Sequence, residues 1–295
     1  MPSSGPKLVK IQPDPSLLSL MVTMRWQGKE LATGTGFVVG AGADRFLITN
    51  RHNLSGRHPR SNEIMHTHGV TPDSVSILYL DISDKQVWRE ISVPVLDAAD
   101  ESPLWFEHPT LGPQVDVVAL KLSLPDGTAL TPYDMAKPED DPVLWVGEDL
   151  FVVGFPFGQS YHRGMGIWTR ASVATEPSVY YNGLPMFLVD ARTRAGQSGS
   201  PVLFRPGLRP VKMTSGQIRT SEMTDYYLAG VYSGRISDES DIGYVWRTSV
   251  IVDIINGQQR FSADGRARTQ ELPPLRGEDG VVRPRQGINK DRRAR

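Results

Sequence analysis

Short apolar runs of strand length recur along most of this chain, and they limit the folds that it can adopt. Glycine, proline, asparagine and aspartate separate the runs, which include LSLMVTMRW, GTGFVVG, RFLITN, SVSILYLD, DVVALKL, DLFVVGF, MFLVDAR and YYLAGVY. Runs of this length with turn residues between them favour a sandwich or a barrel. We therefore expect an all-β protein.

Two local patterns stand out from this background. In TSVIVDIINGQQ, residues 248–259, three isoleucines recur at helical spacing and a glycine stands near the end. This pattern predicts a helix with one apolar face. In VYYNGLPMFLV, the pair Asn182 and Gly183 is flanked by aromatic and apolar residues, which predicts a tight two-residue hairpin turn.

The composition narrows the compartment and the chemistry. The 295 residues include no cysteine, so the chain has neither disulfides nor thiolate chemistry. The sequence has no run of about 18 apolar residues that would predict a membrane span. Its start, MPSSGPKLVKIQPDPS, lacks the charged-then-apolar layout of a signal peptide. We expect a cytoplasmic protein that does not associate with membranes.

The C-terminal segment differs in composition from the rest of the chain. Residues 260–295 hold ten Lys or Arg against five Asp or Glu, and they are rich in Pro and Gly. Segments this charged and this poor in large apolar residues are typically disordered, which is our interpretation. The alternative is a docking arm for a protein or a nucleic acid. Nucleic acid is the weaker hypothesis, because the net charge of the chain is −1.

One loop, RAGQSGSPVLF at 194–204, concentrates small residues just ahead of an apolar run. A bend at Gly196 would let the N–H groups of Gly196 and Ser198 converge on one point, where they could hold an oxyanion. A serine hydroxyl is a poor nucleophile unless a base takes its proton and a third group orients that base. Ser198 is therefore a candidate nucleophile, although a plain glycine turn before a strand would look the same.

Two other residues suit the supporting roles. His52 directly follows the apolar run RFLITN, which would hold its imidazole rigidly. Asp116 opens the apolar run DVVALKL, and a carboxylate fused to such a run is costly to bury without a partner. We expect His52 to act as the base and Asp116 to orient it, with no metal and no cofactor.

The three candidates follow one another in the order His, Asp, Ser. His52 in LITNRHN, Asp116 in VDVVALKL and Ser198 in GQSGSP thereby resemble the chymotrypsin/trypsin-like serine peptidases. The segments GTGFVVG, WFEHPTLGPQVDVVAL, FVVGFPFG, LAGVYSGR and SVIVDIIN are also similar to that family. The resemblance extends over about residues 17–259, and the cysteine-free chain looks most like the bacterial-type branch.

The resemblance implies a fold and an organisation. It implies two six-stranded antiparallel β-barrels of the chymotrypsin-like type with a C-terminal helix, and a site in the cleft between the barrels. The expected organisation is an N-terminal extension over 1–16, a peptidase domain over 17–259 divided near 124–142, and the basic tail over 260–295.

The resemblance also implies an activity. It implies a serine endopeptidase that acts on a protein or peptide through an acyl-enzyme, with His52, Asp116 and Ser198 as the triad. The N–H groups of Gly196 and Ser198 would form the oxyanion hole. The alternative is a catalytically silent domain of the same fold that binds another protein. A regulatory partner protein is a further hypothesis without support from particular residues.

The same resemblance leaves the substrate preference open between two alternatives. The resemblance implies a substrate pocket with Arg192 at its base and walls formed by Thr193, Tyr232, Ser233, Gly234 and Arg235. A guanidinium at the base would pair with an acidic side chain before the scissile bond. If the ring of Tyr232 fills the pocket instead, only a small aliphatic side chain fits.

Gln197 marks a departure from the digestive members of the family. Those members carry an aspartate before the nucleophile, which pairs with a new N-terminus after cleavage. A neutral glutamine cannot form that ion pair, so we expect activity without N-terminal clipping.

Overall fold

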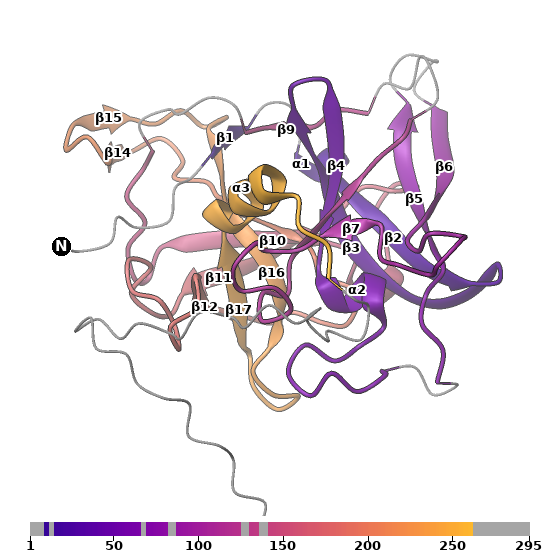
Figure 1. The fold of residues 1–295 in the computed structure, drawn as a ribbon. Helices are drawn as coiled ribbons and strands as arrows, with labels where there is room; N and C mark the ends of the chain where they lie inside the picture. The colour runs from indigo at the N-terminus through magenta and orange to yellow at the C-terminus, as the bar shows by residue number, and fades with distance from the viewer. Residues whose placement is uncertain are drawn as a thin grey trace, which may run out of the picture.

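The computed structural model describes residues 9–11, 15–65, 69–81, 87–124, 130–135 and 141–261. In these residues the chain forms two large, mainly antiparallel sheets, one from each half of the sequence. In Figure 1 the N-terminal sheet lies at the right in indigo and purple, and the C-terminal sheet lies at the left in pink and orange. The expectation of a β-rich fold is confirmed.

The N-terminal sheet has the strand order β6-β5-β2-β3-β4-β8-β7, with β9 paired in parallel to β3. The strands are β2 (Ser19–Trp26), β3 (Lys29–Ala41), β4 (Asp44–Thr49), β5 (Ser74–Asp81), β6 (Val87–Pro94), β7 (Trp105–Phe106), β8 (Val118–Lys121) and β9 (Tyr133–Asp134). Within the described ranges no strand pairing joins β6 to β7, so this sheet stays open.

The C-terminal sheet closes into a barrel. Its six strands pair in the order β16-β13-β10-β11-β12-β17, and β16 also pairs with β17. They are β10 (Asp149–Gly154), β11 (Ile167–Val173), β12 (Met186–Ala191), β13 (Pro201–Phe204), β16 (Tyr226–Arg235) and β17 (Ile242–Arg247). Strand β1 (Val9–Ile11) adds to β16 from outside, and β14 (Pro210–Lys212) pairs with β15 (Ile218–Thr220) as a separate hairpin.

The expectation of two closed barrels is therefore met by one barrel only. At one edge of the N-terminal sheet, β7 is just two residues long and offers little ladder for pairing. At the other edge, β6 has mostly exposed or half-buried side chains. A short edge strand and a solvated edge strand are common ways of ending a sheet without closure.

A shared core joins the two sheets to the C-terminal helix. Phe37 and Ile48 from the N-terminal sheet, Leu203 and Val231 from the barrel, and Ile251 from α3 (Thr248–Gly257) belong to one buried cluster. The apolar face of α3 is the one that the sequence predicted, so the helix is confirmed. Since α3 packs on both sheets, it fixes their relative position (Figure 1).

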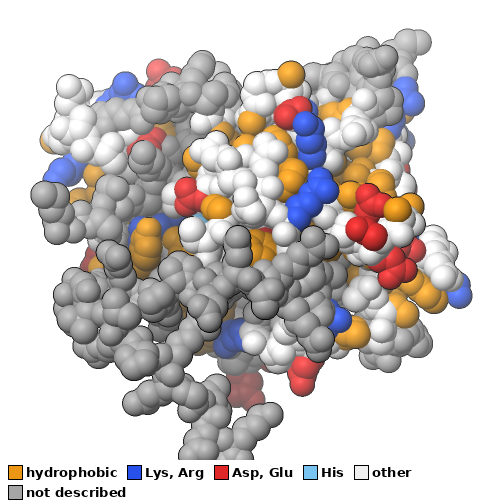
Figure 2. Space-filling view, viewed as in Figure 1, with side chains coloured by type: hydrophobic (Ala, Val, Ile, Leu, Met, Phe, Trp, Pro, Cys, Tyr) orange, Lys and Arg blue, Asp and Glu red, His pale blue; other side chains and the backbone are white. Residues whose placement is uncertain are grey.

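The remaining helices are short. They are α1 (Pro15–Leu18), α2 (Arg51–Ser55) and the 3-10 turn η1 (Pro156–Gly158). None of the helices in the described part of the chain has the length and apolar character of a membrane span. Figure 2 shows basic and acidic side chains scattered over the same face of the molecule as hydrophobic ones. Of the predicted basic tail, all but the first two residues lie outside the described residues.

Candidate active site

The imidazole of His52 stands on the short helix α2, immediately after β4. The residue before it is anchored in the interior, because buried Arg51 forms an ion pair with buried Glu107, with 3.0 Å between Nε and Oε1. The indole N–H of Trp105 donates to the same carboxylate oxygen at 3.0 Å. Helix α2 ends at Gly56, which has a left-handed φ of 64°. The helix that carries His52 is therefore anchored to the protein interior by the ion pair between Arg51 and Glu107.

Asp116 meets His52 at two points. Its Oδ1 accepts the backbone N–H of His52 at 2.9 Å, and its Oδ2 lies 2.7 Å from Nδ1 of the imidazole. The carboxylate is buried, and the side chain of His52 is only 10% exposed. In this arrangement Nδ1 carries a proton and donates a hydrogen bond to the carboxylate. Nε2, on the other edge of the ring, is then the hydrogen-bond acceptor.

A third group holds the same carboxylate. The hydroxyl of Ser233 donates a hydrogen bond to Oδ2 of Asp116. The sequence analysis placed Ser233 in the wall of a substrate pocket and gave it no contact with Asp116. The pairing joins residues 117 positions apart in the chain, so no local pattern could have predicted it.

The loop that carries Ser198 depends on two glycines with left-handed backbone. Gly196 has a φ of 92° and Gly199 a φ of 88°, a region that side chains strongly disfavour. A Cβ at Gly196 would collide with the carbonyl oxygen of Phe155, and a Cβ at Gly199 with that of Thr35. Both positions therefore require glycine for the loop to pack as it does.

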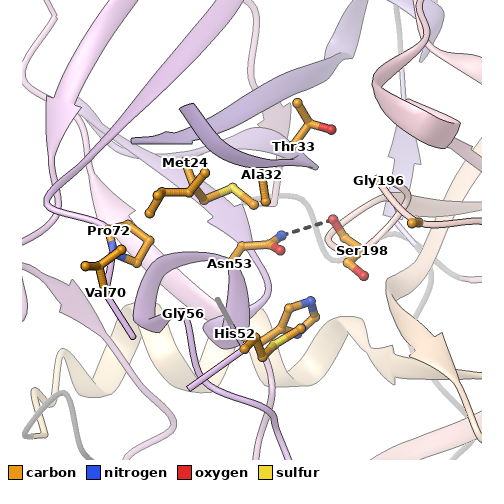
Figure 3. A pocket seen from close by; sticks show the side chains of 13 residues that line it. Met24, Ala32, Thr33, His52, Asn53, Gly56, Val70, Pro72, Gly196 and Ser198 are labelled. Atoms are coloured by element: carbon orange, nitrogen blue, oxygen red, sulfur yellow. Dashed lines mark hydrogen bonds between the residues drawn. The ribbon is translucent and has the colours of Figure 1, made fainter. Parts of the chain in front are cut away.

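The N-terminal sheet holds this loop in place. The carbonyl oxygen of Ser198 accepts the backbone N–H of Thr35 at 2.8 Å and the side-chain amide of Asn53 at 3.1 Å. Figure 3 shows the second bond, with Asn53 and His52 side by side on α2. Thr35 also donates its hydroxyl to the carbonyl of Gly196 at 2.8 Å. These contacts bring the loop from the barrel to the helix from the first sheet.

Two backbone N–H groups of the loop have no hydrogen-bond acceptor in the described part of the chain. Among the described residues, none accepts a hydrogen bond from the N–H of Gly196 or of Ser198. The next residues are engaged, since the N–H of Gly199 donates to Tyr232 at 2.9 Å and that of Ser200 to Gln197 at 3.1 Å. Unused N–H groups flanking a bend form a site for an anion.

The hydroxyl of Ser198 makes one described contact, to the carbonyl oxygen of Ser233 at 3.3 Å. No hydrogen bond to His52 is formed by any described side chain other than that of Asp116. Ser198 and His52 nevertheless line the same cavity. A rotation about the Cα–Cβ bond of Ser198 changes the direction of its hydroxyl, and such contacts are often looser without substrate.

Gln197 braces the loop with its side chain. It is fully buried. Its Oε1 accepts the backbone N–H of Arg194 at 2.8 Å, and its Nε2 donates to the hydroxyl of Thr169 on β11 at 2.8 Å. A neutral amide thus ties the loop to the barrel at the position where sequence analysis noted the absence of an acid.

The six residues predicted to form a substrate pocket have different surroundings. Thr193 and Tyr232 are buried, and their hydroxyls are hydrogen bonded to each other. Tyr232 is 2% exposed, its ring lies against Gly243, and burial raises the pKa of its phenol to about 12. Arg192 is exposed and pairs with none of the described acids.

Gly234 and Arg235, two of the other predicted wall residues, follow Ser233 at the end of β16. Arg235 donates to the backbone carbonyl of Asp238 at 2.8 Å and lies 3.6 Å from its carboxylate. Gly234, with a φ of 144°, has open space where a Cβ would stand. The region beside Thr193 is therefore occupied by the aromatic ring of Tyr232, whereas Arg192 is exposed and Arg235 contacts Asp238.

A cavity of about 360 Å³ opens directly beside His52 and Ser198. Sequence analysis did not predict it, because its walls come from β2, β3, α2 and two loops. It is lined by Met24, Leu31, Ala32, Thr33, His52, Asn53, Gly56, Met65, Val70, Pro72, Ala195, Gly196 and Ser198 (Figure 3).

In the described part of the chain, no three His, Asp or Glu side chains are grouped so that they could hold a metal ion.

Comparison with known proteins gives one family and a set of solved structures. The model of the trypsin-like peptidase domain matches residues 34–207. The Rv3671c protease of M. tuberculosis in its active form is similar at 18% identity over 88% of this chain and 93% of that chain, with a TM-score of 0.41. A serine endoprotease from Yersinia pestis is similar at 13% identity over 83% of this chain and 66% of its own, with a TM-score of 0.48. No curated protein matches the sequence.

Proposed function

Since the chain belongs to the trypsin-like peptidase domain family, we propose that it is a serine endopeptidase that hydrolyses peptide bonds through an acyl-enzyme. The nucleophile is Ser198, the base is His52, and Asp116 orients the base. The substrate is a protein or a peptide. We also propose a bacterial-type, cytoplasmic enzyme, with the open N-terminal sheet in the place of the family's first barrel.

The observation that carries the proposal is the double contact between His52 and Asp116. One carboxylate oxygen takes the backbone N–H and the other faces Nδ1 at 2.7 Å. This pairing sets the tautomer in which Nε2 is free to take a proton. His52 lines the same cavity as a serine whose loop has two N–H groups without an acceptor among the described residues.

The reaction follows from these groups. Oγ of Ser198 attacks the carbonyl carbon of the substrate and gives its proton to Nε2 of His52. The carbonyl oxygen becomes an anion, which the N–H groups of Gly196 and Ser198 hold. Collapse of this intermediate breaks the C–N bond, and His52 passes the proton to the leaving amine. A water molecule then releases the acyl group by the same steps, so that Ser198 and His52 return to their starting states.

The rival proposal is a silent binding module, and one observation favours it. The Ser198 hydroxyl points to the carbonyl of Ser233. In an active enzyme this contact is a resting position that the substrate displaces. In a silent domain it is the permanent one, and the hydroxyl never reacts.

Hydrolysis of an unstructured protein substrate separates the two. We expect Ser198→Ala to lower the turnover on the order of a millionfold, because triad members act as a unit. Asp116→Asn costs about ten-thousandfold, since the imidazole then takes the wrong tautomer.

Ser200→Ala is the matched control for Ser198→Ala, because it lies in the same loop and is fully buried. Its hydroxyl has no hydrogen-bond partner among the described residues, so its removal leaves turnover unchanged. Equal hydrolysis by wild type and Ser198→Ala would overturn the proposed activity.

A further inference from the structure

The cavity beside the proposed nucleophile has mainly apolar walls. Met24, Pro72 and Val70 lie on one side, across from Gly196 and Ser198 (Figure 3). Its volume of about 360 Å³ lies near the lower end of the range of about 300–1,000 Å³ that ligand pockets occupy. It therefore has room for a large side chain of a peptide.

The walls also indicate which side chains are excluded. Apart from His52, none of the described residues in the lining is titratable. A carboxylate or an ammonium group placed here would lose water without gaining an ion pair from these described residues, which is strongly unfavourable. The described walls thus favour an apolar side chain.

The position of the cavity indicates which half of the substrate, before or after the scissile bond, it would bind. His52 must reach the leaving amine to protonate it, and His52 forms part of the lining together with Ser198 and Gly196. None of the six residues predicted to surround the acyl half lines the cavity. It therefore lies on the leaving-group side of the scissile bond.

The acyl side offers little room in comparison. The ring of Tyr232 is buried beside Thr193 and packs against Gly243. An acyl-side residue with a large side chain would meet this ring, so selection for large side chains cannot come from there. Neither Tyr232 nor Thr193 is part of the lining of the cavity of about 360 Å³ beside the nucleophile.

We propose that this chain selects its cleavage sites by a large apolar residue, such as Leu, Met or Phe, directly after the scissile bond. The inference rests on the proposed endopeptidase activity. It adds the determinant of specificity, which is the cavity on the leaving-group side.

The test uses peptides that differ only in the residue after an Ala at the cleaved bond, which is Leu, Phe, Ala, Asp or Lys. We expect kcat/KM for Leu and Phe to exceed that for Asp and Lys by at least about tenfold, because apolar pockets discriminate on this scale. In the intact Ser198→Ala protein, the dissociation constants of the same peptides follow the same order.

Two variants locate the effect. Ala32 is an exposed residue of β3 at the cavity, so Ala32→Trp fills the cavity without disturbing the core. It should reduce the Leu to Asp ratio to near one in both measurements. Ala43→Trp is the matched control, because Ala43 is exposed in the turn between β3 and β4 and is not part of the lining. It keeps the wild-type ratio.

The outcomes separate the two proposals. Equal binding of all five peptides, or a preference for Leu that survives Ala32→Trp, would overturn the cavity assignment even if the protein is an active peptidase. Selective binding of Leu by Ser198→Ala, without hydrolysis by the wild type, would leave the cavity as an apolar side-chain site and contradict the endopeptidase.

Discussion

The hydroxyl of Ser233 donates a hydrogen bond to Oδ2 of Asp116, the oxygen that also faces Nδ1 of His52. The other oxygen accepts the backbone N–H of His52. Three donors thus converge on a single buried carboxylate. Hydrogen bonds to an ionised group are shorter and stronger than neutral ones, so the carboxylate is fixed before a substrate arrives.

Ser233→Ala removes one of these three donors. We expect kcat to fall by about ten- to hundredfold, because a hydrogen bond to a charged group contributes about 1.5–3 kcal/mol. KM changes little, and Ser233→Thr, which retains a hydroxyl, recovers most of the loss. Steady-state kinetics on a single peptide measures kcat and KM for the wild type and both variants. A raised KM with normal kcat would show instead that Ser233 forms part of a substrate-pocket wall, as the family resemblance of the sequence implied.

Gln197→Leu tests the neutral brace under the nucleophile loop. The leucine fills a similar volume, but it leaves the N–H of Arg194 and the hydroxyl of Thr169 without their partner. We expect a loss of about 1–3 kcal/mol in the free energy of unfolding, measured by denaturant titration. Gln217→Leu is the control, because that side chain is exposed on the β14–β15 hairpin. Equal stability of the two variants would refute the brace.

Gln197 also shows how far the sequence could be interpreted. Its identity indicated that an ion pair with a new N-terminus is absent, which is a local statement. Its partner Thr169 lies on another strand, 28 positions away. A single sequence contains no signal for that pairing, because side-chain partners across a barrel depend on strand register. For the same reason the contact of Ser233 with Asp116 was missed.

The turn at Asn182 and Gly183 and the helix α3 could be predicted from local sequence patterns. The extent of the hairpin and of the sheets could not, because it depends on how the strands pair. Asn182 and Gly183 both have positive φ, 53° and 72°, as a tight turn requires. The flanking residues form an isolated bridge between Tyr181 and Leu184 rather than a full hairpin. The N-terminal sheet stays open because its edge strand β7 has only two residues and its other edge strand β6 is solvated, and the apolar runs gave no signal for either.

Tyr232→Val tests whether the aromatic ring limits the acyl half of the substrate. Removing the ring opens space beside Thr193. We expect the variant to gain at least about tenfold in kcat/KM for peptides with Leu before the scissile bond. Its unfolding free energy falls by about 3–5 kcal/mol, as is common when a large buried side chain is truncated. Unchanged discrimination in a folded Tyr232→Val protein would show that the ring does not occupy the acyl site.

Tyr232→Phe tests the ionisation of the buried phenol. Burial raises the pKa of Tyr232 to about 12, whereas an unfolded tyrosine titrates near 10. Below pH 10 both states keep the proton and the stabilisation is complete. Between about pH 10 and 12 only the unfolded state releases it, so the free energy of unfolding decreases as the pH rises.

The phenylalanine variant lacks this contribution and should lose less stability between pH 9 and 11 than the wild type. Urea titrations at the two pH values measure both slopes. Tyr133, which is also buried and has a raised pKa, contributes equally to both proteins and cancels in the comparison. Parallel slopes would contradict a buried, protonated Tyr232.

The central claim is that the Ser198 hydroxyl is an activated nucleophile. A fluorophosphonate reagent reacts with such a serine and leaves a stable adduct, which mass spectrometry of the intact chain and of its peptides can locate. We expect a single adduct on Ser198 in the wild type, none in His52→Ala or Ser198→Ala, and wild-type labelling in Ser200→Ala. A folded, full-length protein that stays unlabelled, or that is labelled equally without His52, would contradict the account.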